Sequence, residues 1–375
     1  MYNLLDKYIE KLLKESTPKR PIWNIEYLDK LKEVKWNYID GCMMTALIEL
    51  GNITKNEKYI DFVENFIDYY VFEDGTIRGY KVEEYNLDNV NEGKVLFTLY
   101  KITKKSKYKK AIELIYSQLE NHPRIEGGNF WHKKIYPNQV WLDGIYMAQP
   151  FYLKYELEFN NLKNYDDIFN QIKNVKDKMY DKQKQLYYHG YDHSKSMFWA
   201  DKEKGVSKNF WLRATGWYTV ALADILEMIL DKGSDKYKSI SDQFIETIDG
   251  LLKYQDVSGM WYQVIDKTDI KDNYLETSGT AMIAYAILKG VRLGILSEKY
   301  LVIGKKAFDG ICNKYLTNRN GDLNLGGICL VAGLGPENNK RRDGSIKYYL
   351  SEPIVENDAK GVGPLLLAYT EIRRL

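Results

Sequence analysis

The sequence predicts an all-α fold in which paired helices close into a ring. Apolar residues recur at three- and four-residue spacing along almost the whole chain, and short stretches rich in Gly, Asn, Asp or Lys separate these segments. Counting the weaker segments gives about twelve helices, so that a helix-turn-helix unit of roughly thirty residues repeats about six times. An open α-solenoid has the same periodicity, and helix count and length do not separate it from a closed toroid.

The strongest helical segments follow one another along the chain. They cover residues 40–50, 59–70, 93–102, 108–119, 151–159, 213–230, 244–254, 277–293 and 363–372. Pro150 has no amide hydrogen to donate to residue 146, so the turn that contains Asp143 is expected to be kinked, or distinct from the helix that follows.

Three segments break the helical pattern, namely 130–140, 260–273 and 326–356. Each combines aromatic, charged and glycine residues. Connections of this kind, at one end of a rigid scaffold, are where functional sites usually lie. The functional residues are therefore expected to gather at one rim of the helical ring.

Composition and charge set the protein class. No Pro-, Gly- or Ser-rich linker divides the sequence, so residues 1–375 are expected to form one domain. The 54 Lys and Arg residues nearly balance the 52 Asp and Glu residues, and this favours neither nucleic acid nor a membrane as partner. Residues 1–14 lack the apolar core of a signal peptide, so the sequence predicts a cytoplasmic protein. It leaves the oligomeric state open.

The cysteines indicate neither a disulfide nor a metal centre. Cys42, Cys312 and Cys329 form an odd set without metal-ligand spacing, and each has apolar neighbours. They are expected to be buried free thiols. Aromatic residues make up 14% of the chain, which suits both a sugar-binding surface and an ordinary core.

Two carboxylates are candidates for acid/base chemistry. Asp143 lies beside Trp141 at the start of a predicted helix, and Asp88 lies in Asn-Leu-Asp-Asn just before another. Either aspartate could simply cap its helix. Alternatively, aromatic surroundings could raise the pKa of Asp143 and make it a general acid. Acid/base cleavage of a glycosidic bond requires at least two carboxylates in different environments.

Histidine and arginine side chains supply further candidates. His189 and His193 have the spacing of a helical zinc pair, but Gly190 interrupts the segment and no third protein ligand is evident, so hydrogen bonding to sugar hydroxyls is the better use of these histidines. Arg213 lies between Trp211 and Trp217, where a guanidinium could pair with a carboxylate while the rings stack on a sugar. An arginine stacked on surface aromatics would give the same pattern.

Taken together, these segments resemble the unsaturated rhamnogalacturonyl hydrolases of glycoside hydrolase family 105. The matching stretches occur in family order and are 36–41 (WNYIDG), 87–93 (LDNVNEG), 140–147 (VWLDGIYM), 211–217 (WLRATGW), 259–264 (GMWYQV), 274–280 (YLETSGT) and 349–358 (YLSEPIVEND). Many relatives have a second Gly or Asn before the last Gly-Trp of the fourth stretch. That departure affects only the local shape of the segment.

The resemblance implies an (α/α)6 barrel that needs no metal or other cofactor. By position in the motifs, Asp143 matches the general acid/base of the family and Asp88 its second active-site carboxylate. The remaining matched positions imply contacts with the substrate and are Asp40, Gly41, His132, Lys133, Trp141, His189, Arg213 and Trp217.

The family activity is the release of a 4,5-unsaturated galacturonic acid from the non-reducing end of small rhamnogalacturonan-derived oligosaccharides. The resemblance implies that Asp143 protonates C4 of the double bond and that water then adds at C5. Two alternatives stay open. One is an unsaturated glucuronyl hydrolase acting on another polyuronide, since the two families share a fold. The other is a toroid that binds sugars without cleaving them.

Overall fold

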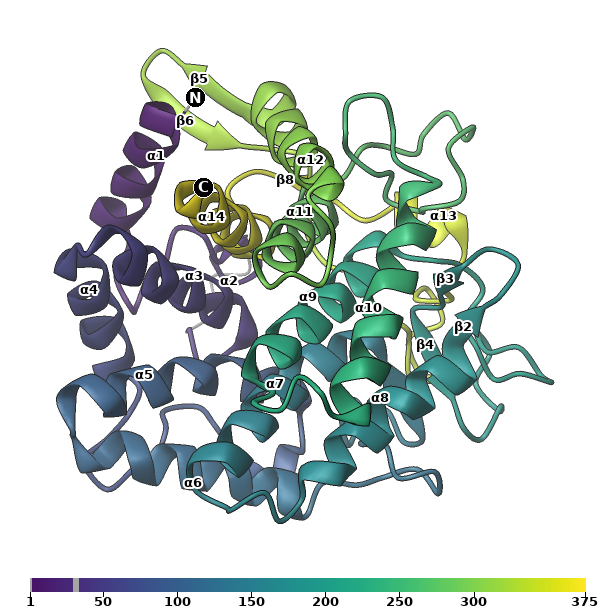
Figure 1. Ribbon diagram of the computed structural model, residues 1–375, viewed down its shortest axis with the longest axis horizontal. Coiled ribbons are helices and arrows are strands. Elements are labelled where there is room, and N and C mark those ends of the chain that lie inside the picture. Colours follow the sequence, from purple (N-terminus) through teal and green to yellow (C-terminus); the bar gives the residue numbers. More distant parts are fainter. Residues whose placement is uncertain (1, 30–33) are drawn as a thin grey trace.

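The computed structural model describes residues 2–29 and 34–375 and confirms the all-α fold (Figure 1). Its α-helices are α1 (Tyr2–Glu15), α2 (Ile25–Asp29), α3 (Tyr38–Thr54), α4 (Glu57–Asp68), α5 (Lys94–Thr103), α6 (Ser106–Glu120), α7 (Leu142–Glu158), α8 (Tyr165–Met179), α9 (Leu212–Met228), α10 (Asp235–Leu252), α11 (Thr277–Arg292), α12 (Lys299–Tyr315), α13 (Ile346–Leu350) and α14 (Ala359–Arg374). Two short 3₁₀ helices, η1 (Val82–Glu84) and η2 (Leu87–Gly93), precede α5.

The inner wall of the molecule is a closed ring of helices. Around it, α3 contacts η2, η2 contacts α7, α7 contacts α9, α9 contacts α11, α11 contacts α14, and α14 returns to α3. Helices α1, α4, α6, α8, α10 and α12 lie outside this ring (Figure 1). The closing contact between α14 and α3 makes the fold a six-hairpin toroid rather than an open solenoid.

Burial differs between the two layers in the way their sequences suggest. The outer helix α4 buries one stripe of side chains, Tyr59, Val63, Phe66 and Ile67. The inner helix α11 instead buries every residue from Thr277 to Val291, because neighbours cover it on both sides. A one-sided apolar stripe is typical of a surface helix and all-round burial of an internal one.

The inner helix α7 runs through Pro150 without a break, so the turn that contains Asp143 is part of α7 and not a distinct helix. Proline cannot donate to the carbonyl of Tyr146, which would leave a buried acceptor unpaired. Lys94 Nζ donates to that carbonyl over 2.7 Å and lies 3.4 Å from the centroid of the Tyr146 ring. The Lys94 side chain therefore supplies the missing hydrogen bond.

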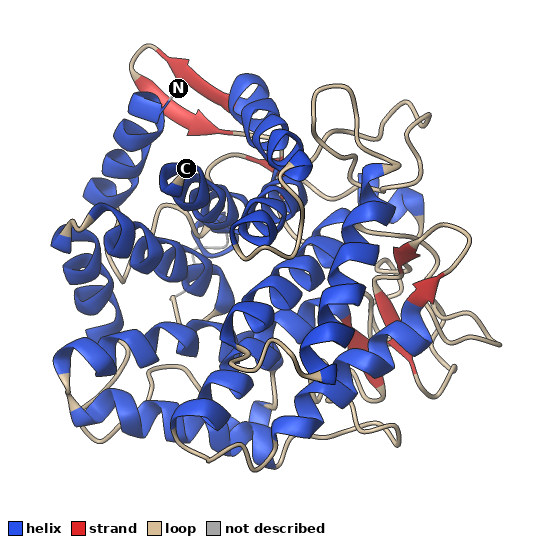
Figure 2. Ribbon diagram, viewed as in Figure 1, coloured by secondary structure: helices blue, strands red, loops and turns tan. Residues whose placement is uncertain are grey.

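Strands are short and lie in the connections between helices (Figure 2). They form four antiparallel pairs among the described residues. The pairs are β1 (Gln139–Trp141) with β4 (Gly190–Asp192), β2 (Tyr180–Asp181) with β3 (Leu186–Tyr187), β5 (Leu316–Arg319) with β6 (Asp322–Leu325), and β7 (Ile328–Cys329) with β8 (Ile354–Val355).

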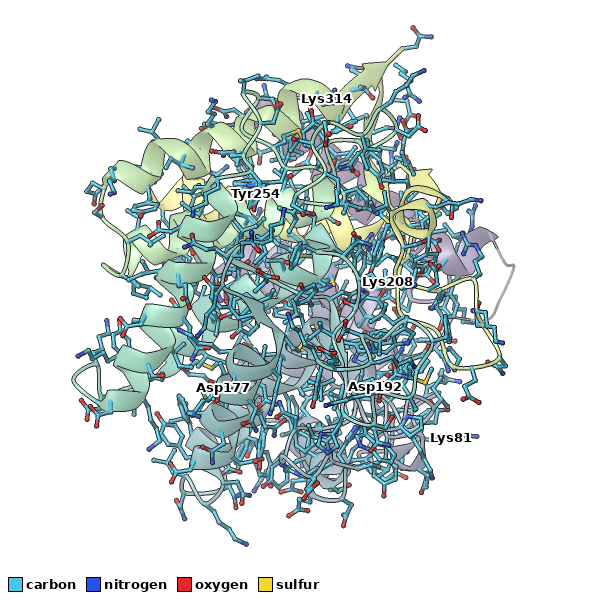
Figure 3. All side chains as sticks on the ribbon, turned by 90° about the vertical axis from the view of Figure 1, so that its right-hand side faces the viewer. Lys81, Asp177, Asp192, Lys208, Tyr254 and Lys314 are labelled. Atoms are coloured by element: carbon cyan, nitrogen blue, oxygen red, sulfur yellow. The ribbon has the colours of Figure 1, made fainter. Side chains whose placement is uncertain are left out.

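The three irregular segments predicted from the sequence precede inner helices and meet at one end of the ring. Segment 130–140 leads into α7, 260–273 into α11, and 326–356 into α14. In Figure 3, Lys81, Asp192 and Lys208, which come before η2, in β4 and before α9, lie on the same side of the molecule. Segment 326–356 is more ordered than expected, since it contains β7, α13 and β8.

Two further expectations concern the cysteines and the membrane. Cys42, Cys312 and Cys329 are free and buried, as predicted. Among the described residues, no helix combines the length and the apolar character that crossing a membrane requires.

Candidate active site

A cavity of about 180 Å³ lies at the N-terminal ends of the inner helices. This volume equals the share of about six water molecules in the liquid, which suits one sugar-sized group rather than a polymer chain. The cavity is lined by Glu26, Tyr38, Asp88, His132, Lys133, Tyr136, Trp141, Asp143, Met147, Trp211, Arg213, Trp217, Val331, Ala332 and Arg342.

Most of the residues selected from the sequence meet in this cavity. Asp88, His132, Lys133, Trp141, Asp143, Arg213 and Trp217 all line it. They come from η2, from the segment before β1, from the end of β1, and from the first turns of α7 and α9. The folding of the ring therefore brings together side chains that are far apart in the sequence.

Asp88 is held by cationic and polar neighbours rather than acting as a helix cap. The cap of η2 is Asn86, whose side chain accepts a hydrogen bond from the amide of Asp88. The Asp88 carboxylate lies 2.5 Å from Lys133 Nζ and 3.5 Å from His132 Nε2. Burial alone would raise the pKa of Asp88, but Lys133 and His132 outweigh it and hold that pKa below its usual value. Asp88 is therefore a carboxylate at neutral pH.

Replacing Lys133 with Met should move the acidic limb of the pH profile of kcat/KM to higher pH. Without the ammonium, burial dominates and raises the pKa of Asp88. Protonated Asp88 then accumulates at a pH where the wild-type residue is still charged. Kinetics across the acidic range test this, with Lys134→Met as the control, because Lys134 is the exposed neighbour of Lys133 and does not line the cavity. An acidic limb that stays in place would contradict the assigned role of Lys133.

His132 is a neutral, tightly packed part of the wall. It is 2% exposed and stacks on Trp141 with ring centroids 4.2 Å apart. Burial lowers its pKa to about 4, although the nearby Asp88 opposes the shift. Gly144 makes room for the ring, since a Cβ at that position would lie 3.1 Å from His132 Nδ1.

Asp143 is in a different electrostatic environment. It is the second residue of α7, and its Oδ2 atom is buried without a hydrogen-bond partner among the described residues. Its nearest basic group is His189, with Nε2 3.4 Å from Asp143 Oδ2. His189 in turn contacts the Tyr349 hydroxyl through Nδ1 over 2.7 Å. One cavity therefore contains a carboxylate paired with a lysine and a second whose Oδ2 atom has no hydrogen-bond partner among the described residues.

Arg213 and the neighbouring tryptophans form the deep end of the cavity. Arg213 is 1% exposed and donates from Nη2 to the carbonyl of Cys329, whereas its Nε atom has no partner among the described residues. Its guanidinium lies 5.2 Å from the centroid of Trp211. Trp217 stacks on Tyr146 with centroids 4.5 Å apart and also lines the cavity.

Three selected residues do not line the cavity. The Asp40 side chain turns away and accepts hydrogen bonds from Trp23, Asn24 and Asn37. Gly41 lies where α3 packs on η2, and a Cβ there would come within 2.8 Å of Glu92 Cα. His189 is fully buried behind Asp143. The structure therefore places these residues in supporting positions around the cavity.

Other cavity residues were not selected from the sequence. Tyr38, Met147 and Trp211 lie inside the matched stretches, so those stretches contained a signal for them. Tyr136, Val331, Ala332 and Arg342 come from irregular segments outside the stretches. The sequence contained no signal for these four residues beyond the expectation that irregular segments lie at the rim of the ring.

A second cavity, of about 190 Å³, lies at the C-terminal ends of the inner helices. Ion pairs occupy its wall, including Lys289 with Asp224 at 2.7 Å and Arg292 with Glu371 at 2.6 Å. None of the selected residues line it.

Metal ligands do not come together around the histidines. His189 contacts Tyr349, while His193 Nε2 lies 3.6 Å from Glu126, and the two histidines flank β4 rather than share a helix. Within 2–29 and 34–375, no three His, Cys, Asp or Glu side chains are placed to hold a metal ion.

Comparison with known proteins supports the same family. A model of Glycosyl Hydrolase Family 88 matches residues 8–375. A solved glycoside hydrolase from family 105 of C. acetobutylicum ATCC 824 is 43% identical, with a TM-score of 0.91 over 100% of this chain and 99% of its own. The unsaturated rhamnogalacturonyl hydrolase YesR of Bacillus subtilis is 27% identical over 272 residues, which are 71% of this chain and 73% of YesR.

A more distant structure shares the fold alone. The unsaturated glucuronyl hydrolase from Bacillus sp. GL1 is 12% identical, with a TM-score of 0.64 over 92% of this chain and 88% of its own. The family match and the family 105 structure each span nearly the whole chain. The chain therefore belongs to the family 88 and family 105 group of glycoside hydrolases and is a glycosidase of the unsaturated uronyl type.

Proposed function

We propose that this enzyme releases a 4,5-unsaturated galacturonic acid from the non-reducing end of small rhamnogalacturonan-derived oligosaccharides, by hydrating the C4=C5 double bond. The observation that carries the proposal is the presence, in one sugar-sized cavity, of a carboxylate fixed by Lys133 and of a second whose ion-pair neighbour among the described residues is His189. The named activity of YesR supports the choice of rhamnogalacturonan.

The proposed reaction uses Asp143 twice. The C4=C5 bond of the substrate is conjugated to the carboxylate, and the ring oxygen on C5 makes it an enol ether. Asp143 donates its proton to C4, and the ring oxygen stabilises the cation that forms at C5. Asp143, now a carboxylate, takes a proton from the water that adds at C5. The resulting hemiketal opens, which leaves a hemiacetal at C1 that expels the aglycone.

Asp88 and His189 have supporting roles in this scheme. Asp88 stays charged beside Lys133 and orients either the water or a sugar hydroxyl. His189 contacts Asp143 on one side and Tyr349 on the other, so it positions the acid without entering the cavity. Both roles require an Asp143 that changes its protonation state during the reaction.

The cavity is suited to an anionic sugar. The N-termini of α7 and α9 meet at it, and helix N-termini carry partial positive charge. Arg213 and Arg342 add formal positive charges to its wall, whereas Lys133 is paired with Asp88. The proposal also takes residues 1–375 as one catalytic domain that works in the cytoplasm, without metal or other cofactor, on small unsaturated oligosaccharides.

A substrate comparison tests this proposal. C4 is planar in the substrate, so unsaturated galacturonic and glucuronic residues are identical, and selectivity must come from the aglycone. We expect kcat/KM for unsaturated galacturonyl-rhamnose to exceed that for an unsaturated uronyl-N-acetylgalactosamine by at least about tenfold. Loss of the ultraviolet absorbance of the conjugated acid measures both reactions. The reverse preference would favour the glucuronyl hydrolase alternative, and binding without turnover of either compound would favour the non-catalytic one.

A further inference from the structure

Arg342 differs from the other cations of the cavity because its guanidinium is unpaired. Lys133 is neutralised by Asp88 at 2.5 Å, and Arg213 donates to the Cys329 carbonyl. The Arg342 guanidinium makes neither a hydrogen bond nor an ion pair with any described residue, although it lines the same cavity. The acids that share this wall are Glu26, Asp88 and Asp143, and none of them lies within ion-pair distance of Arg342.

The position of Arg342 is at the mouth of the cavity. The deep wall is almost completely buried, with Arg213 at 1%, Trp217 at 2% and Asp143 at 9% exposure. Val331, Ala332 and Arg342 are only partly buried and belong to residues 330–345, here called the rim loop. The other partly buried residues of the wall are Glu26, Tyr38, Asp88 and Lys133. An enzyme that removes the terminal sugar places that sugar at the deep end. The aglycone would then lie at the mouth, which the rim loop borders on one part of its edge.

The rim loop holds Arg342 in a defined place. The Gly335 amide donates to the Arg342 carbonyl over 2.8 Å, and the Gly333 amide donates to the Tyr348 hydroxyl over 3.0 Å. At its far end, Asn209 Nδ2 donates to the Gly344 carbonyl over 2.8 Å. The loop backbone is thus tied to the scaffold, and this reduces the conformational cost of using its side chain to bind a ligand.

Contacts around the guanidinium set its direction. A Cβ at Gly333 would lie 3.2 Å from Arg342 Nη1 and 3.3 Å from the Trp141 ring, so glycine lets the guanidinium approach that ring. The charge of Arg342 also works against the raised pKa of Lys133, which shares the cavity wall. With Asp88 already pairing Lys133, the positive charge of Arg342 is left uncompensated at the mouth.

We propose that Arg342 binds a carboxylate carried by the aglycone, so that the preferred substrates are acidic beyond the unsaturated sugar. A guanidinium forms two parallel hydrogen bonds with a carboxylate, and an unpaired arginine needs no existing ion pair to be broken first. In a rhamnogalacturonan fragment this carboxylate belongs to the galacturonate beyond the rhamnose. In a homogalacturonan fragment it belongs to the sugar next to the unsaturated one. The inference rests on the proposed function.

The test uses two substrates that differ only in this carboxylate. Unsaturated digalacturonate is compared with the same disaccharide whose reducing-end carboxylate is converted to an amide. The wild-type enzyme should prefer the acid by about tenfold in kcat/KM, because a charge-assisted hydrogen bond is lost with the amide. Arg342→Gln should bring the ratio of the two kcat/KM values close to one by lowering kcat/KM for the acid. Arg342→Lys should retain part of the preference for the acid.

Controls separate a local contact from the general field of the protein. Lys340→Gln removes the same charge from an exposed rim-loop residue that does not line the cavity, and should keep the wild-type ratio. Added salt should reduce the wild-type preference for the acid and leave the rate with the amide nearly unchanged. An Arg342→Gln enzyme that loses rate equally on both substrates, or keeps the wild-type ratio, would overturn the proposal.

Binding measurements keep this test independent of the proposed reaction. The dissociation constants of both disaccharides are measured by calorimetry in an Asp143→Asn background, with and without Arg342→Gln. Tighter binding of the acid that disappears with Arg342 supports the contact even where no bond is cleaved. Failure of the wild-type enzyme to consume unsaturated galacturonyl-rhamnose would instead count against the proposed hydrolase function. Equal affinities for the two compounds would contradict the role of Arg342.

Discussion

Asp143→Asn should yield a folded protein whose kcat is reduced by about three orders of magnitude or more. Asparagine has nearly the same shape but cannot supply a proton to C4 or accept one from water. Folding should be preserved, because Asp143 Oδ2 makes no hydrogen bond to the described residues and its neighbour His189 is already held by Tyr349. The ultraviolet absorbance of an unsaturated disaccharide measures turnover, and thermal unfolding measures stability.

The comparison needs a variant with the same chemical change elsewhere. Asp166→Asn, on the outer helix α8, removes a carboxylate that pairs with Lys236 at the surface, and should leave kcat unchanged. Substrate affinity measured by calorimetry should change much less in Asp143→Asn than kcat does. Near-normal turnover by a folded Asp143→Asn enzyme would remove Asp143 from the mechanism and leave Asp88 and Glu26 as the remaining acids of the cavity.

Much of the fold could be predicted because helix periodicity is local. The stripe of apolar residues on α4 and the all-round apolar character of α11 both follow from spacing within one segment. The course of α7 could not be predicted in this way. Whether Pro150 breaks a helix depends on a donor for the Tyr146 carbonyl, and that donor, Lys94, lies on a different helix.

The residues of the candidate site could also be predicted only in part. Motif matches brought out Asp88, Asp143 and Arg213, which lie at or near the starts of helices and reach the cavity. The same matches included Asp40, whose side chain is occupied by Trp23 and two asparagines. The direction of a side chain depends on neighbours distant in sequence. Arg342 was missed because nothing in the sequence distinguishes an unpaired arginine from the paired Arg341 beside it.

The second large expected effect is the loss of turnover when the C4=C5 double bond of the substrate is saturated. An ordinary glycosidase protonates the leaving oxygen and attacks the anomeric carbon, so it cleaves a saturated uronide at least as readily as an unsaturated one. Hydration requires the C4=C5 bond, and the asymmetry between Asp88 and Asp143 fits a reaction in which one acid protonates carbon. The saturated compound should therefore bind in the cavity and remain intact.

The central measurement is thus the turnover of galacturonyl-rhamnose with and without the double bond, at equal concentration and with release of rhamnose as the common readout. Both compounds carry the same aglycone, the same carboxylate and most of the same hydroxyl groups, so a difference in rate comes from the C4=C5 bond. We expect rapid release of rhamnose from the unsaturated compound and none above background from the saturated one. Comparable release from both would contradict hydration and indicate a conventional hydrolase that uses Asp143 and Asp88 at the anomeric carbon.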